Sequence, residues 1–202
     1  MKRGDDLKKG ILKMEICLVR HGETDWNKAG KLQGHTDIEL NENGIKQAEQ
    51  CAQFLKGSGY EIVLTSPLKR AKQTAQIIAQ NNALPIIEAP LFIERNYGQA
   101  EGMSYEERIE KFPNRNYPNQ ETKEALRERV IKGLKQIREQ RSEKKIILVA
   151  HGGVINCILA VLSNDEIGSG KTKLANACLS EIIYEKNEWA IKSFNEITHL
   201  PI

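Results

Sequence analysis

The amino-acid sequence predicts an α/β protein whose central sheet is covered by helices on both faces. Short apolar runs alternate along the chain with amphipathic segments, which is the pattern of consecutive strand–helix units. The 202 residues contain no internal repeat and no interdomain linker, so we expect one domain over residues 14–202. The polar segment 1–13 lacks the apolar core of a signal peptide, and we interpret it as a disordered leader.

The first strand and the first helix have clear boundaries in the sequence. The apolar run 15–19 is expected to form a buried strand that stops at Arg20. A helix should begin near Asn41 and end before the glycines at 57 and 59, which favour a C-terminal stop. The apolar face of this helix is predicted to contain Ile45, Ala48, Ala52 and Leu55.

The next strand–helix unit begins near residue 61. Residues 61–64 are expected to form a second strand. Ser66 should cap a helix that has Pro67 in its first turn and continues to about residue 79. A short strand at 86–87 then precedes an irregular stretch that contains several glycines and prolines.

The second half of the chain completes the sheet. A long helix is predicted over 121–142, followed by a strongly apolar strand at 146–150 and a buried helix over 152–162. Residues 178–184 and 189–194 should form a closing pair of strands joined by a turn. The order of the strands in the sheet does not follow from these patterns.

Composition and charge argue against several classes of function. A formal net charge of +3 is too small for a nucleic-acid-binding surface. The apolar run 146–162 is interrupted by His151, two glycines and Asn156, which favours a buried strand and helix over a membrane span. The four cysteines lie far apart and form no zinc-binding pattern, so we expect a reducing, cytoplasmic environment and no metal.

Charged and aromatic side chains follow the three best-defined strands. Arg20 and His21 come directly after the first strand, Arg70 lies about one turn into the helix after the second, and His151 follows the strand at 146–150. Ligands of open parallel sheets bind at the carboxyl ends of the strands, so these four residues should converge although they are far apart in sequence. The helix expected to start at Gly152 would add free N–H groups.

Two guanidinium groups and two imidazoles at one site favour a phosphate ester as the ligand. Arginine remains charged and offers paired donors that match phosphate oxygens. A neutral imidazole can attack phosphorus while the cations stabilise the transition state. A carboxylic acid would be needed to protonate the leaving group. The residues alone leave Glu88, Glu94 and Glu101 open as candidates for this acid.

The motifs that contain these residues resemble those of a known family. Residues 18–27 (LVRHGETDWN), 65–75 (TSPLKRAKQTA) and 149–153 (VAHGG) closely resemble the histidine phosphatase superfamily, and more narrowly its phosphoglycerate mutase-like branch. The resemblance extends from about Glu15 to His199. It implies a three-layer α/β/α sandwich with a mostly parallel central sheet, and a reaction that needs no metal or other cofactor.

The resemblance also implies roles for individual residues. His21 would be the nucleophile that becomes phosphorylated, and Glu94 would be the proton donor. The phosphoryl group would be held by Arg20, Arg70 and His151. The substrate-binding set would be completed by Asn27, Gln33, Gly34 and Gly152.

Hydrolysis is favoured over a mutase reaction by the length of the chain after Glu94. Mutases of the family carry a longer insertion with a basic cluster before the residue that corresponds to His151, and the cations Arg108, Lys111 and Arg115 follow no mutase pattern. A shorter lid leaves the site more accessible to water. We therefore expect a phosphatase acting on a small phosphorylated metabolite, with phosphoglycerate mutase as the alternative. A non-catalytic phosphate-ligand binder is a third possibility, which the presence of both His21 and Glu94 disfavours.

One segment departs from the family pattern. Several hydrolytic relatives carry Gly-Glu-Ser before the long helix, where this chain has Gln120-Glu121-Thr122. The carboxylate and the hydroxyl are kept while the glycine is not. We expect a helix cap here, and any contact of this segment with substrate is in doubt.

Several other residues carry weaker expectations. His35 and His199 are expected at the surface, with the pocket rim as an alternative position for His35. Trp26 and Tyr97 are explained as well by core packing as by substrate contact. The segment 168–172 (GSGKT) resembles part of a nucleotide-binding P-loop but lacks the first glycine of that motif, so a surface turn is the better interpretation. The sequence identifies neither the physiological substrate nor the oligomeric state.

Overall fold

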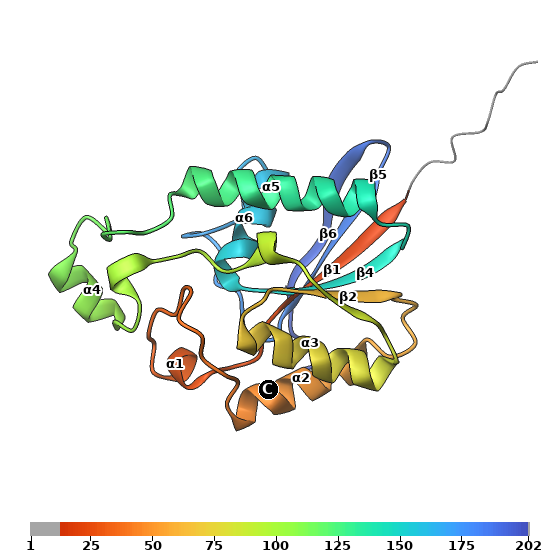
Figure 1. The fold of residues 1–202 in the computed structure, drawn as a ribbon, viewed down its shortest axis with the longest axis horizontal. Helices are drawn as coiled ribbons and strands as arrows, with labels where there is room; N and C mark the ends of the chain where they lie inside the picture. The colour runs from red at the N-terminus through yellow and green to blue at the C-terminus, as the bar shows by residue number, and fades with distance from the viewer. Residues whose placement is uncertain (1–12, 202) are drawn as a thin grey trace, which may run out of the picture.

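The computed structural model describes residues 13–201, which form three layers of secondary structure (Figure 1). The strands are β1 (Met14–Arg20), β2 (Ile62–Thr65), β3 (Ile86–Glu88), β4 (Lys145–Ala150), β5 (Leu179–Glu185) and β6 (Glu188–Glu196). The helices are α1 (Asp25–Lys28), α2 (Glu42–Phe54), α3 (Lys69–Asn82), α4 (Tyr105–Lys111), α5 (Lys123–Gln140) and α6 (Gly152–Leu162), with 3-10 turns η1 (Pro90–Phe92) and η2 (Gly98–Ala100). Residues 1–12 of the predicted leader lie outside the described part of the chain.

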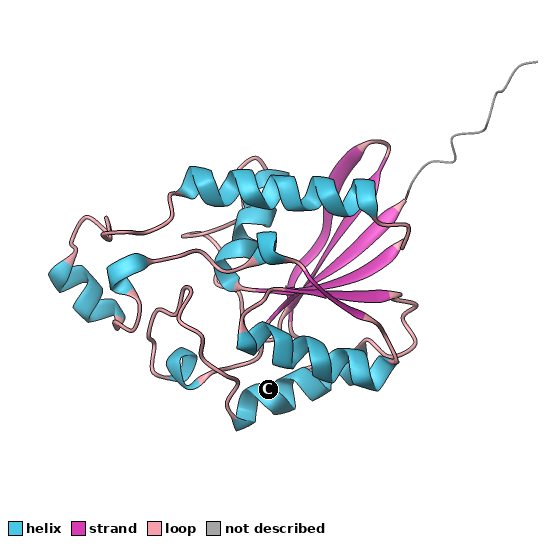
Figure 2. Ribbon diagram, in the orientation of Figure 1, coloured by secondary structure: helices cyan, strands magenta, loops and turns pink. Residues whose placement is uncertain are grey.

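The strands form one sheet in the order β3-β2-β4-β1-β5-β6 (Figure 2). β1 pairs in parallel with β4, β4 with β2, and β2 with β3. β5 runs antiparallel to both β1 and β6. The prediction of a mostly parallel sheet is therefore confirmed. Because β1 and β4 are neighbours and parallel, the residues that follow them emerge side by side at the same edge of the sheet.

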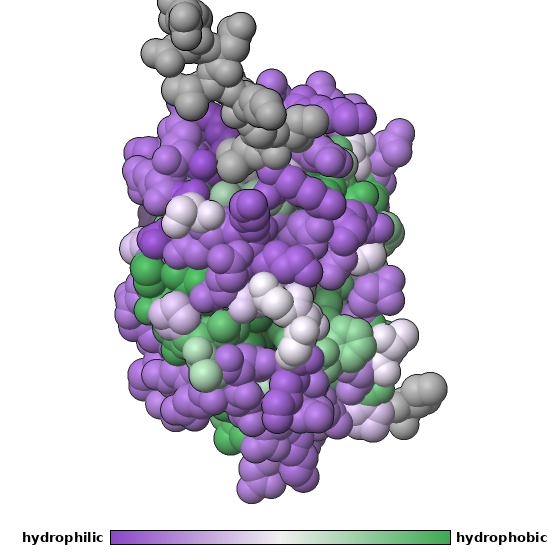
Figure 3. Space-filling model, turned by 90° about the vertical axis from the view of Figure 1, so that its right-hand side faces the viewer, coloured by the Kyte–Doolittle hydropathy of each residue, from purple (hydrophilic) through white to green (hydrophobic). Residues whose placement is uncertain are grey.

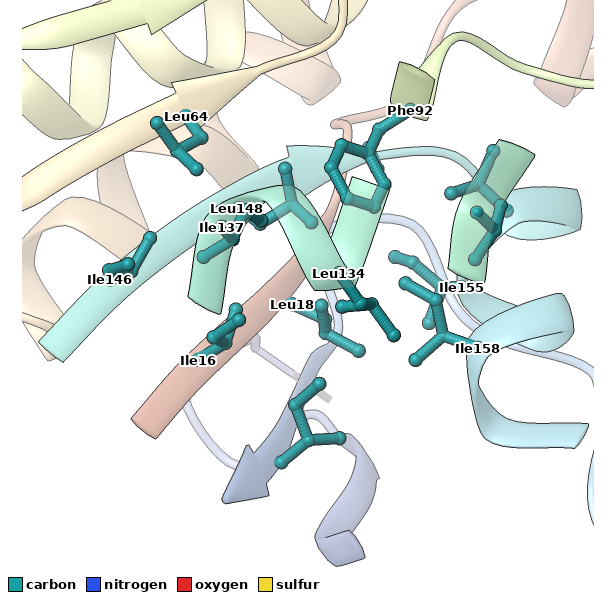
Figure 4. Close-up of a cluster of buried hydrophobic side chains, with 14 of the residues drawn as sticks. Ile16, Leu18, Leu64, Phe92, Leu134, Ile137, Ile146, Leu148, Ile155 and Ile158 are labelled. Carbon is teal, nitrogen blue, oxygen red and sulfur yellow. The ribbon is translucent and has the colours of Figure 1, made fainter. Parts of the chain in front are cut away.

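Two hydrophobic cores lie on opposite faces of the sheet, because successive strand residues point to opposite sides. Ile16 and Leu18 of β1 belong to the core beneath α5 and α6, together with alternate residues of β2 and β4 (Figure 4). Cys17 and Val19 belong to the second core, which α2 and α3 cover. Figure 1 shows these two helix pairs on opposite sides of the strands, so the predicted three-layer arrangement is confirmed.

The start of α3 differs from the prediction. The helix begins at Lys69 with Leu68 at the N-cap position and no side-chain cap, so neither Ser66 nor Pro67 belongs to it. The hydroxyl of Ser66 lies 2.6 Å from Nε2 of His151. The same hydroxyl accepts from the N–H of Leu68 at 3.4 Å, in the turn before the helix, so it does not cap the helix and the capping prediction was wrong.

The buried face of α2 is also rotated relative to the prediction. Ile45 is 41% exposed, whereas Ala48, Ala52 and Leu55 are buried as expected. The inward side of the helix starts at Gly44 and includes Cys51. Small residues line this side because α2 packs closely on α3, where Ala71 and Ala75 face it within the same core.

Two short helices appear that the sequence did not predict, α4 in the stretch expected to be irregular and α1 in a stretch without a prediction. Ser104 caps α4, and Glu107 completes a reciprocal capping box with it. Thr24 and Asn27 form the same arrangement at the start of α1. The Ser-x-x-Glu spacing of a capping box is visible in the sequence and would have identified α4. Figure 1 places α1 and α4 at the side of the molecule away from the β5–β6 turn.

Across residues 13–201, no single element concentrates the large apolar side chains that are exposed. Exposed large hydrophobic residues are scattered over α2, β3, α4, α5 and β6, and the face in Figure 3 shows hydrophilic side chains around smaller hydrophobic areas. No helix within residues 13–201 combines the length and the apolar character needed to cross a bilayer.

Two glycines bring the segment after β1 into direct contact with the start of α2. A Cβ atom on Gly22 would lie 2.3 Å from the carbonyl oxygen of Gly44. A Cβ atom on Gly44 would lie 2.0 Å from the carbonyl oxygen of Glu23. Backbone atoms cannot move aside as a flexible side chain can, so this contact fixes the path of the chain beside His21.

We predict that Gly44→Ala destabilises the protein, although glycine-to-alanine changes inside helices ordinarily stabilise them by up to about 1 kcal/mol. The added methyl group would overlap the Glu23 carbonyl, and we expect a loss of about 1–3 kcal/mol. Urea unfolding measures the change. Glu49→Ala, at an exposed position of the same helix, serves as the control and should be nearly neutral. A stabilised Gly44→Ala variant would contradict the close approach.

Candidate active site

The sheet places the two predicted site histidines next to each other. In the β1–β4 register Arg20 is opposite Ala150, so His21 and His151 form the next pair beyond the strands. The main-chain N–H of His21 donates to the carbonyl of Ala150 at 3.0 Å, and the centroids of the two imidazole rings are 5.2 Å apart. This separation is close to the spacing of about 4.8 Å between neighbouring strands.

The side chain of His21 is buried and has a defined tautomer. Its Nδ1 atom lies 2.7 Å from the carbonyl oxygen of Gly22. Since a carbonyl only accepts hydrogen bonds, Nδ1 carries the proton and Nε2 keeps a free lone pair. Burial first, and then the charges of Arg70 and Arg20, lower the pKa of His21 well below its ordinary value. The ring is therefore neutral near pH 7.

His151 is fully buried and its charge is suppressed in the same way. Burial, followed by Arg70, His21 and Arg20, lowers its pKa well below the usual range. Its Nε2 atom contacts the Ser66 hydroxyl, while Nδ1 is buried without a hydrogen-bond partner among the described residues. A second neutral ring thus lies beside His21.

Arg20 and Arg70 supply the positive charge of the site. Arg70 is 1% exposed and donates from Nη1 and Nη2 to the carbonyls of Thr36 (3.0 Å) and Gly34 (2.8 Å). Arg20 donates to the carbonyl of Leu174 at 2.6 Å. Burial lowers the pKa of both guanidinium groups, but arginine stays protonated at neutral pH. The Nε atoms of both are buried and unpartnered within residues 13–201, which leaves donors for an anion.

Glu94 is held by main-chain N–H groups. It is 8% exposed, with Oε1 accepting from the N–H of Arg95 at 2.8 Å and Oε2 from the N–H of Gly153 at 3.0 Å. A Cβ atom on Gly153 would lie 2.5 Å from Oε1, so only glycine leaves room for the carboxylate here.

The two other candidate acids are engaged away from this position. Glu88 forms an exposed ion pair with Lys72. Glu101 accepts hydrogen bonds from the main-chain N–H groups of His35, Thr36 and Tyr97 and from the Thr36 hydroxyl, at 2.6–3.0 Å. Burial opposes its ionisation, but these hydrogen bonds outweigh that effect and lower the pKa of Glu101. Of the three acids, Glu94 is the one that lines the cavity.

A cavity of about 260 Å³ lies in front of these groups. Its lining includes every residue predicted for the site except His151, which lies behind it. The lining residues are Arg20, His21, Asn27, Gly30, Lys31, Leu32, Gln33, Gly34, Arg70, Glu94, Tyr97, Arg108, Gly152 and Gly153. The predicted residues are thus brought together, and Asn27 is part of the cavity wall as well as the capping partner of Thr24 in α1.

Several residues of the site were missed or misjudged from the sequence. Ser66 was interpreted as a helix cap but contacts His151. Lys31 and Arg108 at the rim carried no recognisable motif. Asn176, from the loop before β5, donates to the carbonyls of His21 (3.2 Å) and Gly22 (3.3 Å) and to Asn27 Oδ1 (3.1 Å). No local pattern marks Asn176, because its position depends on how β5 returns beside β1.

A second cavity of about 340 Å³ shares Tyr97 and Gly153 with the first. Its walls come from the first turns of α5, from α6 and from the loop 165–171. The glycine-rich segment 168–172 lies in this loop, and the Lys171 ammonium donates to the carbonyl of Asp165. Within residues 13–201, no group of three or more His, Cys, Asp or Glu side chains is arranged to hold a metal ion.

The family model of the histidine phosphatase superfamily (branch 1) matches residues 16–197. The chain belongs to this superfamily. It is 46% identical over 185 residues to the uncharacterized phosphatase PhoE of Bacillus subtilis (strain 168), covering 92% of this chain and 96% of that protein. It is 35% identical to a metal-independent phosphoserine phosphatase of Arabidopsis thaliana, over 98% of this chain and 88% of the relative.

A solved structure supports the same assignment. A mutant phosphoserine phosphatase from Entamoeba histolytica, in complex with phosphoserine, superposes with a TM-score of 0.81 at 32% identity, covering 93% of this chain and 100% of that one. The chain is therefore an enzyme of the histidine phosphatase superfamily, with phosphatases among its relatives.

The lowered pKa values of His21 and His151 predict a pH-dependent stability of this histidine phosphatase. Below the ordinary histidine pKa of about 6.5, the unfolded chain takes up protons that the folded chain does not, so stability is present above this pH and falls as the pH drops. Each histidine should remove about 1.4 kcal/mol between pH 7.5 and 5.5.

Urea unfolding at the two pH values measures this loss in the wild type and in His151→Asn. The variant should lose less stability on acidification than the wild type, because one buried neutral imidazole has been removed. An identical loss in both proteins would contradict the assignment of a neutral, buried His151.

Proposed function

We propose that this enzyme hydrolyses small phosphomonoesters through a phosphohistidine formed on His21. The observation that carries the proposal is a neutral imidazole, with its Nε2 lone pair free, beside two guanidinium groups that have buried and unpartnered Nε donors. A protonated ring could not attack phosphorus, and a site without the cations would not attract a phosphate dianion.

Binding of the phosphoryl group is assigned to Arg20, Arg70 and His151, with the main-chain N–H groups at the start of α6 as additional donors. Gly152 opens this helix and lines the cavity. The N-terminus of a helix favours anions because its first N–H groups have no partner within the helix. Asn27, Gln33 and Gly34 would form the wall beside the leaving group.

In the first step, the Nε2 lone pair of His21 attacks phosphorus and the bond from phosphorus to the ester oxygen breaks. Glu94 acts as the general acid and gives a proton to the departing oxygen, so an alcohol leaves and Glu94 becomes a carboxylate. Arg20 and Arg70 stabilise the negative charge on the phosphoryl oxygens in the transition state.

In the second step, water attacks the phosphorus of the phosphohistidine. The Glu94 carboxylate accepts a proton from this water while the phosphorus–nitrogen bond breaks and the lone pair returns to Nε2 of His21. Inorganic phosphate leaves, and both residues are restored to their starting states. His21, Glu94, the substrate and water account for every bond and proton of the cycle.

The size and charge of the cavity indicate the class of substrate. A volume of about 260 Å³ admits a phosphate and a leaving group of a few heavy atoms. Lys31 and Arg108 add positive charge at the rim, which favours leaving groups that carry a carboxylate. The phosphoserine phosphatases among the relatives act on a substrate of this kind. We place the enzyme in the cytoplasm, since its cysteines are free thiols.

We predict that hydrolysis of p-nitrophenyl phosphate persists in excess EDTA and is lost in His21→Ala. The alanine variant lacks the nucleophile and should retain less than about 0.1% of the wild-type kcat, since removal of a nucleophile of this kind costs several orders of magnitude. His199→Gln, a histidine outside the cavity, is the matched control. Activity that disappears with EDTA, or that survives in His21→Ala, would contradict the proposal.

We also predict that Glu94→Gln affects substrates according to their leaving group. An alkyl phosphate needs a proton on its departing oxygen, so its kcat/KM should fall about 10²–10³-fold. p-Nitrophenol leaves readily as an anion, and its ester should be affected much less. Glu88→Gln, in an exposed ion pair, should leave both rates unchanged. Equal losses on the two substrates would remove Glu94 from the role of proton donor.

A further inference from the structure

We infer that Arg129 of α5 is a positioning residue for Glu94, and that Glu121 holds Arg129 in place. This inference rests on the proposed function, because it concerns the proton donor of that reaction. Neither residue lines the cavity, so both act through the segment that carries Glu94.

The guanidinium group of Arg129 donates hydrogen bonds to the main chain at both ends of the segment 91–94. Nη1 donates to the carbonyl of Leu91 at 2.7 Å, and Nη2 donates to the carbonyl of Glu94 itself at 3.1 Å. One rigid, planar group thus spans the residues from η1 to the proton donor. The planar geometry of arginine allows this, whereas a lysine ammonium would reach a single point.

Glu121 fixes the orientation of that guanidinium group. Its Oε1 accepts from Arg129 Nε at 2.6 Å and its Oε2 from Nη2 at 2.9 Å, a paired arrangement with defined geometry. The two side chains are only 17% and 16% exposed, so solvent screens the pair weakly. Glu121 belongs to the segment that departs from the family pattern, and the contact with Arg129 gives its carboxylate a role that involves no substrate.

The main chain before α5 is tied to the segment after Glu94. The N–H of Glu121 donates to the carbonyl of Asn96 at 2.8 Å, and Arg95 Nε donates to the carbonyl of Glu121 at 2.9 Å. The N–H of Arg95 in turn binds the Glu94 carboxylate. Displacement of Arg129 or Glu121 would therefore move the main-chain N–H of Arg95, which binds the Glu94 carboxylate. It would also move the main-chain carbonyl of Glu94, which Arg129 binds.

A second side chain, from the loop 33–36, contacts the same carbonyl. His35 Nε2 lies 2.8 Å from the carbonyl oxygen of Glu94 and must donate to it. The Glu94 carbonyl is thus held by Arg129 from α5 and by His35 from the loop that also covers Arg70. His35 is exposed, as the sequence led us to expect, and it is not among the residues that line the cavity.

The fold does not depend on these hydrogen bonds alone. Phe92, two residues before Glu94, is 2% exposed and lies in the core beneath α5 (Figure 4). A Cβ atom on Gly133 of α5 would be 2.6 Å from the Phe92 ring, so the ring packs directly against the helix backbone. This packing keeps η1 on α5 when Arg129 is changed, and the expected defect is a small displacement of Glu94.

The test compares two substrates in Arg129→Gln and Arg129→Lys. A misplaced proton donor should lower kcat/KM for an alkyl phosphate about 10–100-fold, whereas p-nitrophenyl phosphate should lose less than about threefold. Because kcat/KM reports formation of the phosphohistidine, the shared second step does not mask the difference. Arg129→Lys should retain more activity than Arg129→Gln. Arg138→Gln, on the same helix and bonded to Glu139 and Tyr184, is the matched control.

His35→Ala provides a test that leaves α5 untouched. His35 is exposed, so the variant should fold normally, and its defect should show the same dependence on the leaving group. In the background of Glu94→Gln, neither Arg129→Gln nor His35→Ala should lower activity further, because both act through the missing acid.

Three outcomes would overturn the inference. These are equal losses on the two substrates, additive losses in the Glu94→Gln background, and a loss that disappears when rates are corrected for the unfolded fraction. Failure of the proposed function looks different, because the wild type would then show no EDTA-resistant turnover, or His21→Ala would keep it.

Discussion

The guanidinium groups of Arg20 and Arg70 lie at the carboxyl end of the sheet with their Nε atoms buried, and neither forms an ion pair within residues 13–201. Their charge helps to keep His21 and His151 neutral. Their partners are main-chain carbonyls, so the loop 33–36 must fold back over Arg70. Glu101 then secures that loop through three hydrogen bonds, from His35 and Thr36, and Gly34 leaves room for the carboxylate. The shape of the rim follows from the burial of these cations.

The chemistry-bearing residues were predictable because they are tied to regular elements. His21 and His151 follow apolar strands, and a parallel sheet brings such positions together whatever the distance along the chain. Glu94 was different. Its position depends on η1, on the N–H of Gly153 and on α5, none of which is marked near residue 94, and the residues alone left three acids open. The family resemblance selected Glu94 where local physics had no signal.

The errors share a cause, which is that a local rule was overridden by a distant contact. Ser-Pro favours a helix start, but a buried imidazole 85 positions away engages the Ser66 hydroxyl. The apolar stripe expected on α2 included Ile45, but close packing on α3 selects small residues and turns Ile45 outward. Arg129 lies on α5 and Glu121 just before it, and their contact with the main chain at 91–94 becomes visible only in the folded structure. Short-range patterns carry no information about such pairs.

The distance between the His21 and His151 rings limits which parts of such an enzyme can change when its substrate specificity changes. It is set by the hydrogen-bond spacing of β1 and β4, which side-chain changes cannot stretch. The sheet thus fixes the geometry of the reactive centre. Lys31, Tyr97 and Arg108, in contrast, lie on segments outside the strands. Grafting these segments from one relative onto another is a route to changing which leaving group the enzyme accepts. The residues that bind and transfer the phosphoryl group would stay as they are.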